Sequence, residues 1–209
     1  MNAIHRSESA SILGLLSGLR RSFQRHFGFG LSAVRFTLDD DNHRPGEYEI
    51  RIQSTNVNNF FRSRAALSPN CLLAVAPTFL AFHYPGQIEP HPNLKSVFSD
   101  RYCSWLPKSE HPHPVAALLN PAQVIVQHLK ILVSEFPHFF LSRQHFEVQL
   151  ALPSCQGLLG NLQELGIDCE MLWEICRKFV SAQIGIQPFD KFLELVLENP
   201  AARRGARTR

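Results

Sequence analysis

Long runs of apolar residues are scarce in this sequence. The amino-terminal apolar residues are interrupted by Gly14, Ser17 and Arg20, and the apolar segment 71–82 covers only about a dozen residues. A membrane-spanning helix needs about 20 consecutive apolar residues. We therefore expect no transmembrane helix, and the lack of a small-residue cleavage site speaks against a secretory signal peptide.

Closely spaced cysteine pairs and nucleotide-binding motifs are also missing. The five cysteines form no C-x-x-C pair, which is typical of buried thiols in a reducing cytosol. No G-x-x-x-x-G-K-S/T, G-x-G-x-x-G or G-x-S-x-G motif occurs. The net charge is only +3, and four arginines after position 200 supply much of it. We therefore expect no enzyme, no cofactor and no nucleic-acid partner.

Apolar periodicity predicts both helices and strands. A helix is expected over residues 9–27. Strands are expected at 34–38, 48–53, 72–76 and 115–119. Asn120 and Pro121 are typical of a helix start, Gly166 of a helix end, and Asp168 of the cap of the next helix. A last helix is expected from about 188 to 199.

Proline divides the chain into regions. Seven of the fourteen prolines lie between Pro77 and Pro114, where they remove backbone donors and predict an irregular insert with little sheet. The expected α+β fold has a small mixed α/β subdomain, a proline-rich insert, an all-helical subdomain and a disordered basic tail. Their expected ranges are 1–76 with 115–120, 77–114, 121–199 and 200–209.

The stretch Asn120–Gln144 carries a recognisable pattern. Asn120, Pro121, Val124 and His128, with the leucine that follows, resemble the (N/D)-P-x-x-V-(I/V)-x-x-H-L helix of the type III secretion and flagellar export-gate family. Collinear resemblances follow the family from about residue 21 to 199. They include FGFGLSAVRF (27–36), CLLAVAP (71–77) and LLGNLQELGIDCEMLWEIC (158–176). The family's membrane domain and last cytosolic subdomain have no counterpart in this sequence.

The resemblance implies a non-enzymatic protein-binding module of a bacterial type III export apparatus. It would lie in the cytoplasm, or at the cytosolic face of the inner membrane through its partners. In the family this domain forms a ring and receives chaperone–substrate complexes, gatekeeper proteins and other export subunits. The alternative is a stand-alone regulator or effector that reuses the fold for another protein partner.

The family's docking groove implies a set of partner-binding residues. They are Phe82, Tyr84, His91, Leu94 and Gln123. Where the family has a D-P-x-F turn, this sequence has HPNL (91–94). Trp105 is a further candidate, either as an exposed anchor for a partner or as a plug in the core of the insert.

Three other patterns each allow a functional interpretation and a purely structural one. His83, His91, His111 and His113 with Cys103 suggest a zinc hydrolase, but extended proline-rich segments point alternate side chains apart. Phe60 and Phe61 beside two arginines could stack on bases, although core packing is favoured for this presumed loop. His128 lies on the apolar face of its helix, which favours a hydrogen-bonded core histidine.

Overall fold

The chain folds into strands and helices. Contacts between residues group these elements into two compact units. The structure is a computed structural model that describes residues 2–37, 46–53, 60–68, 70–77, 101–109 and 117–199. Unit 1 comprises Met1–Ser17 and Phe36–Ser134, and unit 2 comprises Gly18–Arg35 and Glu135–Arg209. Helix α1 (Asn2–Phe27) contributes to both. The predicted α+β class is confirmed.

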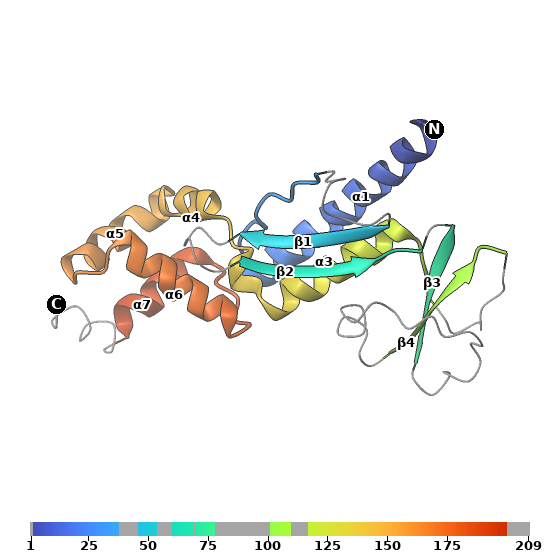
Figure 1. Cartoon of the computed structure of the whole chain (residues 1–209). Coiled ribbons are helices and arrows are strands. Elements are labelled where there is room, and N and C mark those ends of the chain that lie inside the picture. Colours follow the sequence, from blue (N-terminus) through green and yellow to red (C-terminus); the bar gives the residue numbers. More distant parts are fainter. Residues whose placement is uncertain are drawn as a thin grey trace. The chain divides into compact units, whose positions relative to one another are not determined.

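Unit 1 contains two antiparallel sheets (Figure 1). The first is the hairpin of β1 (Glu47–Gln53) and β2 (Phe60–Ala66), paired from Glu47 opposite Ala66 to Gln53 opposite Phe60. The second has the order β4-β3-β5. Its strands are β3 (Cys71–Pro77), β4 (Arg101–Pro107) and β5 (Ala117–Leu119). The strands predicted at 48–53, 72–76 and 115–119 are thus confirmed with slightly different bounds, and β3 is the central strand of its sheet.

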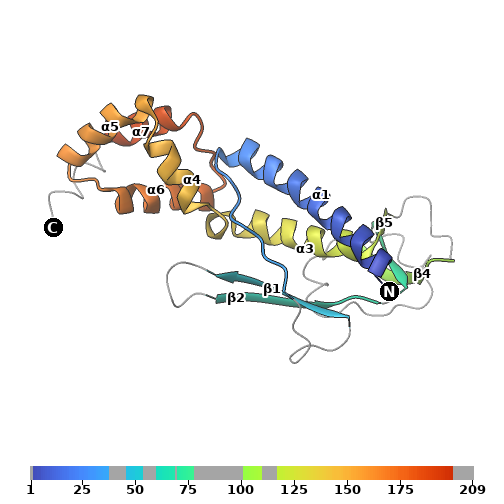
Figure 2. The ribbon, with the colours of Figure 1, turned by 90° about the horizontal axis from the view of Figure 1, so that it is seen from above.

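Helix α3 (Pro121–Glu135) helps to form the core of unit 1. The core cluster joins Leu73 and Val75 of β3, Trp105 of β4, Ala65 of β2 and Val124 of α3. Figure 2 shows the β1–β2 hairpin lying along α3. The contacts therefore group α3 with the strands, whereas the sequence prediction placed 121–199 together in one helical subdomain.

Three predictions for the strands were wrong. The strand predicted at 34–38 is not formed by residues 34–37, the part of it that the structure describes, and the segment before them has an isolated bridge between Leu31 and Leu141. Phe60 and Phe61 belong to strand β2 and not to a loop. The proline-rich insert also contributes a full strand, β4, which pairs along the whole of β3.

Unit 2 is a group of short helices joined by tight turns. They are η2 (Pro137–Phe139), α4 (Arg143–Leu150), α5 (Pro153–Glu164), α6 (Cys169–Ser181) and α7 (Phe189–Glu198). The predicted cap of α6 is confirmed, since Asp168 Oδ1 accepts the Met171 amide at 2.8 Å. The predicted glycine end of α5 is confirmed too: Gly166 has φ +78°, and the Ile167 amide donates to the Leu162 carbonyl.

Aromatic side chains fill the core of unit 2. Phe29 is fully buried and packs edge-on against Phe189, with ring centroids 5.4 Å apart. Phe146 contacts the same ring and also Trp173. None of the helices in the described residues is both long and apolar enough to cross a membrane.

Candidate functional site

The structure describes two of the six residues predicted to bind a partner. Gln123 lies in the first turn of α3 and Trp105 lies in β4. Phe82, Tyr84, His91 and Leu94 lie outside the described residues. The predicted groove therefore stays a prediction, and the part that can be described is the start of α3 with the strand that leads into it.

Trp105 belongs to the core of unit 1. Its side chain is 6% exposed and packs with Leu73, Val75 and Val124. An aromatic side chain in this position contributes buried apolar area to the fold and offers no accessible surface to a partner. The structure thus supports the packing alternative for Trp105, and we exclude it from the candidate surface.

The start of α3 is fixed by a reciprocal pair of hydrogen bonds. The backbone amide of Gln123 donates to Asn120 Oδ1 at 2.9 Å, and the backbone amide of Asn120 donates to Gln123 Oε1 at 2.8 Å. This is a capping box, which satisfies two backbone donors that a helix start leaves without partners. The side-chain oxygen of Gln123 is therefore engaged within the helix start. The sequence prediction missed this role, although the Asn-x-x-Gln spacing signals it.

An exposed apolar residue lies beside this capping box. Leu118 is in β5, at the edge of the β4-β3-β5 sheet, and 39% of its surface is exposed. Two residues later the half-buried Asn120 opens α3. We call Leu118, Asn120 and Gln123 the α3 surface. It combines a fixed backbone, one apolar side chain and two amide side chains.

A buried histidine further along α3 ties the hairpin to the helix. His128 is fully buried, with Nδ1 2.9 Å from the Tyr48 hydroxyl and Nε2 2.8 Å from the Ser63 hydroxyl. A neutral imidazole donates at one nitrogen and accepts at the other, so both hydroxyl contacts are satisfied. The sequence prediction of a hydrogen-bonded core histidine is confirmed.

Burial sets the protonation state of this network. It lowers the pKa of His128 from 6.5 to about 4, because a charged imidazolium would lose its hydration. It also raises the pKa of the Tyr48 hydroxyl, for the same reason applied to a phenolate. The side chains of His128, Tyr48 and Ser63 are therefore neutral at pH 7. They act as a structural support for α3 and not as a charged binding site.

The metal-site alternative finds no support in the described residues. No group of three His, Cys, Asp or Glu side chains there could hold a metal ion. Cys103 is buried in the core of unit 1. The four histidines of the predicted cluster, His83, His91, His111 and His113, lie outside the described part of the chain.

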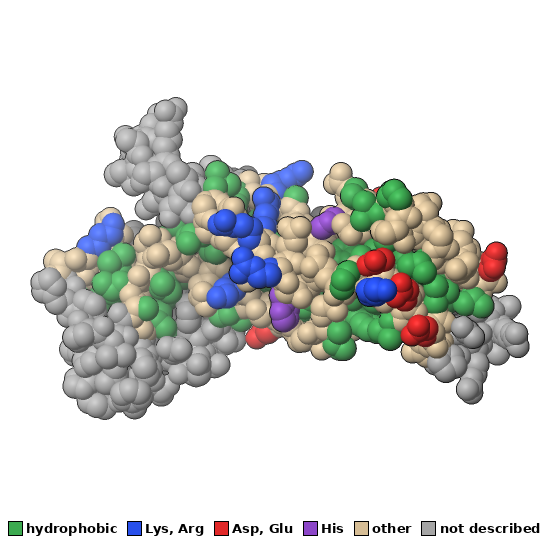
Figure 3. All heavy atoms as spheres, turned by 180° about the vertical axis from the view of Figure 1, so that it is seen from behind, with side chains coloured by type: hydrophobic (Ala, Val, Ile, Leu, Met, Phe, Trp, Pro, Cys, Tyr) green, Lys and Arg blue, Asp and Glu red, His purple; other side chains and the backbone are tan. Residues whose placement is uncertain are grey.

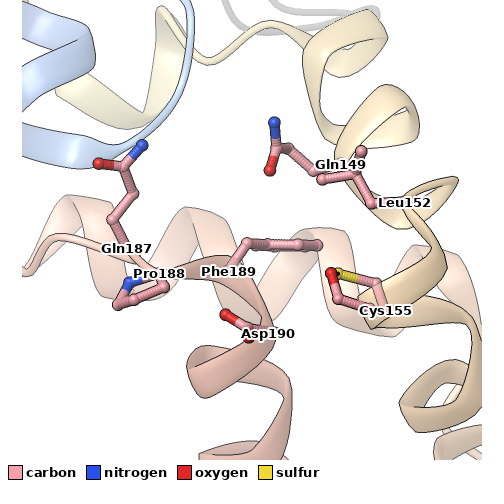
Figure 4. A pocket seen from close by; sticks show the side chains of 8 residues that line it. Gln149, Leu152, Cys155, Gln187, Pro188, Phe189 and Asp190 are labelled. Atoms are coloured by element: carbon pink, nitrogen blue, oxygen red, sulfur yellow. The ribbon is translucent and has the colours of Figure 1, made fainter.

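Unit 2 contains an open pocket that the sequence analysis did not predict. It has a volume of about 490 Å³ and lies between the α4–α5 corner and the start of α7 (Figure 4). Its lining includes Gln149, Leu152 and Cys155 on one side, and Gln187, Phe189 and Asp190 on the other. The one sequence signal for it was the Leu152-Pro153 step, which marks a sharp corner between two helices.

Basic side chains gather on one face of α1. Arg20, Arg21 and Arg25 are exposed, whereas Leu19 and Phe23 on the opposite face are buried. Figure 3 shows the face of the molecule on which Lys and Arg side chains gather. The amphipathic helix predicted over 9–27 is therefore confirmed, and it begins earlier, at Asn2.

Comparison with known proteins shows where this fold has been seen. The Chlamydia pneumoniae CdsV protein matches with a TM-score of 0.63 and 18% identity, over 93% of this chain and 54% of that chain. CdsV in its complex with CdsO matches with a TM-score of 0.60 and 17% identity, over 92% and 56%. The chain thus spans little more than half the length of the proteins it matches.

No family model and no curated protein matches the sequence. CdsV is a type III secretion export-gate protein, and the matching region is its cytosolic domain. The chain therefore has the fold of the cytosolic domain of the type III secretion export gate, as its sequence resemblance predicted.

Proposed function

We propose that this chain is a non-enzymatic protein-binding module of a bacterial type III secretion export apparatus. The observation that carries the proposal is the fold shared with CdsV over 93% of the chain, together with collinear export-gate motifs in the sequence. Fold alone does not fix function. Here the motif Asn120-Pro121 also begins a helix, α3, in the expected place.

The proposed partners are other proteins of the secretion system. CdsV has been solved in complex with CdsO, which supports a protein partner from the same system. We propose chaperone–substrate complexes, gatekeeper proteins or export subunits as the partners of this chain. A homo-oligomeric ring and a location at the cytosolic face of the inner membrane are parts of the same proposal.

We propose that the α3 surface forms one side of the binding site. Leu118 supplies an exposed apolar contact, and the capping box holds the neighbouring backbone in a single conformation. A surface that is ordered before binding loses less conformational entropy on binding. Phe82, Tyr84, His91 and Leu94 of the insert are the proposed opposite side.

Site-specific photo-crosslinking in a secreting cell tests this proposal. A photo-reactive phenylalanine analogue at Leu118 should form adducts with a type III secretion protein, identified by mass spectrometry. The matched control is the same analogue at Lys130, an exposed position on α3 of the same unit. Identical adducts from both positions, or none from a folded and abundant protein at Leu118, would contradict the proposed site.

A further inference from the structure

The last turns of helix α1 carry positive charge and no negative charge. The stretch from residue 9 to residue 38 contains no Asp or Glu, whereas residues 143–199 of the same unit hold eight Asp or Glu and four Lys or Arg. Arg20, Arg21 and Arg25 lie on α1 within unit 2, and all three are exposed. We call these three residues the arginine face. It has no acidic neighbour in its own stretch of chain.

Ion pairs do not neutralise the arginine face. Elsewhere in unit 2, three cations each bond to a glutamate at 2.5–3.1 Å, namely Arg143, Arg177 and Lys191. With the described residues, the side chains of the arginine face form no such bond. Arg25 is in the last turn of α1, where a cation stabilises a helix end, but Arg20 and Arg21 lie before that turn. The stability of the helix therefore does not account for their charge.

The apolar side of this part of α1 is used up inside the protein. Leu19, Phe23 and Phe27 are buried. Arg21 and Arg25 are four positions apart, so the helix places them on the same side, one turn from each other. All of residues 18–35 are described, and none of them is an exposed large apolar residue. A partner that approaches the arginine face therefore meets guanidinium groups without an apolar anchor beside them.

The composition of the arginine face indicates which anionic partner fits it. A stable protein–protein interface has an apolar centre, and proteins that bind single-stranded nucleic acid stack its bases on exposed aromatic rings. Residues 18–35 expose neither feature. The headgroup layer of an anionic bilayer is held by positive charge near its surface, and each guanidinium can donate two parallel hydrogen bonds to a phosphate. The observations therefore favour a lipid surface over an acidic protein or a nucleic acid.

We propose that the arginine face of α1 binds the anionic phospholipid headgroups of a membrane surface. The contact is electrostatic and stays in the headgroup layer, because the apolar side of the helix is buried in unit 2. This inference goes beyond the proposed function, since it assigns a lipid partner to residues that the protein-binding site does not use. Its test needs no secretion protein, so the failure of either proposal leaves the other standing.

Co-sedimentation of the full chain with sucrose-loaded vesicles tests the proposal. One set of vesicles consists of phosphatidylcholine alone, and the other also contains about one third phosphatidylglycerol. Each arginine near an anionic surface contributes about fivefold to binding. The chain should therefore bind the phosphatidylglycerol vesicles and not the neutral ones. Binding should be lost in about 1 M salt, where charges are screened beyond about 3 Å.

Two variants with the same net charge locate the binding. Replacing all three residues of the arginine face by glutamine should weaken binding to the phosphatidylglycerol vesicles by about 100-fold. The control replaces three exposed cations elsewhere by glutamine, namely Arg62, Lys108 and Lys178. It should weaken binding by no more than about twofold, since screening limits the effect of distant charges. Thermal unfolding shows that each variant is folded.

Four results would overturn the proposal. The first is the absence of binding to the phosphatidylglycerol vesicles. The second is equal weakening by the two variants, which would indicate attraction by net charge alone. The third is a loss of less than about threefold in the arginine-face variant, because other cations of the chain would then hold the lipid. The fourth is tighter binding of polyglutamate or duplex DNA than of the vesicles, which would assign the face to an acidic protein or a nucleic acid.

Discussion

The buried His128 network allows a quantitative test of the fold of unit 1. We consider the substitution His128→Leu, which preserves much of the side-chain volume but removes both imidazole nitrogens. The Tyr48 and Ser63 hydroxyls then lose partners at 2.9 and 2.8 Å. A buried polar group left without a hydrogen bond costs about 1–3 kcal/mol. We expect the free energy of unfolding to fall by about 2–4 kcal/mol, since Tyr48 is half-buried and its hydroxyl can partly turn to water.

A rescue experiment separates this explanation from simple mispacking. Adding Tyr48→Phe and Ser63→Ala to the His128→Leu background removes the two hydroxyls that lack partners. Replacing all partners of a buried hydrogen bond by apolar groups is nearly neutral. The triple variant should therefore be more stable than His128→Leu alone, although it carries more substitutions. A triple variant less stable than the single one would refute the reasoning.

The same network predicts a pH dependence. The pKa of His128 is about 4 in the folded protein and 6.5 in the unfolded chain, so the unfolded chain binds more protons between these values. The stability that the neutral imidazole contributes is complete above pH 6.5 and is lost as the pH falls toward 4. At about 1.4 kcal/mol for each pH unit, the loss reaches about 3 kcal/mol.

Urea unfolding monitored by Trp105 fluorescence measures these effects. Trp105 is in unit 1, and a Trp173→Phe background makes it the sole tryptophan, since the chain has two. The stability difference between this background and its His128→Leu derivative should shrink by up to about 3 kcal/mol from pH 7 to pH 4. Titration of the carboxylates changes the stability of both proteins equally, so it cancels in the difference. A constant difference over this range would contradict a buried neutral His128.

Three further predictions follow from local contacts. Gln123→Ala and Asn120→Ala should each lower the urea-derived stability of unit 1 by about 1 kcal/mol, because each opens the capping box. Cys176 is fully buried and burial raises the pKa of its thiol, so mass spectrometry after iodoacetamide treatment of the folded protein should find Cys176 unmodified and the half-buried cysteines modified. Gly28→Ala should lower the thermal stability of unit 2, since Gly28 has φ +85° and a Cβ there would meet the Gln187 side chain; an unchanged melting temperature would contradict the clash.

The sequence predicted those elements whose signals are local. Asn120 and Pro121 mark the start of α3, Gly166 marks the end of α5, and Asp168 caps α6. Each of these signals depends on hydrogen bonds between residues a few positions apart. Such bonds form in the same way wherever the helix is placed, so the sequence alone was sufficient.

Elements that depend on distant pairing were harder to predict. Strand β2, FFRSRAA, has no clear alternation of apolar and polar residues, and it is a strand because β1 pairs with it. Strand β4 was not predicted because it lies in the proline-rich segment. Its residues 101–107 nevertheless pair with β3 along the whole strand. The segment 34–37 has suitable residues yet no such partner, and it forms no strand.

The same difference between local signals and distant contacts applies to the candidate site. The buried state of His128 was predictable from its position on an apolar helix face, but its partners, 65 and 80 residues away, were not. The pocket of unit 2 was missed because Leu152 and Phe189 come together only through the packing of α5 against α7. The capping role of Gln123 was available from spacing alone, and the resemblance to a docking residue obscured it.

The contact between His128 and the hairpin also sets an order for folding during synthesis. Ser63 leaves the ribosome 65 residues before His128, and at about 5–20 residues per second this interval lasts roughly 3–13 s. During that time the β1–β2 hairpin has no helix to cover it, and an isolated two-stranded hairpin is marginally stable in water. The nascent chain should thus expose Ile52 and Ala65 for several seconds, a window in which a ribosome-associated chaperone can bind them.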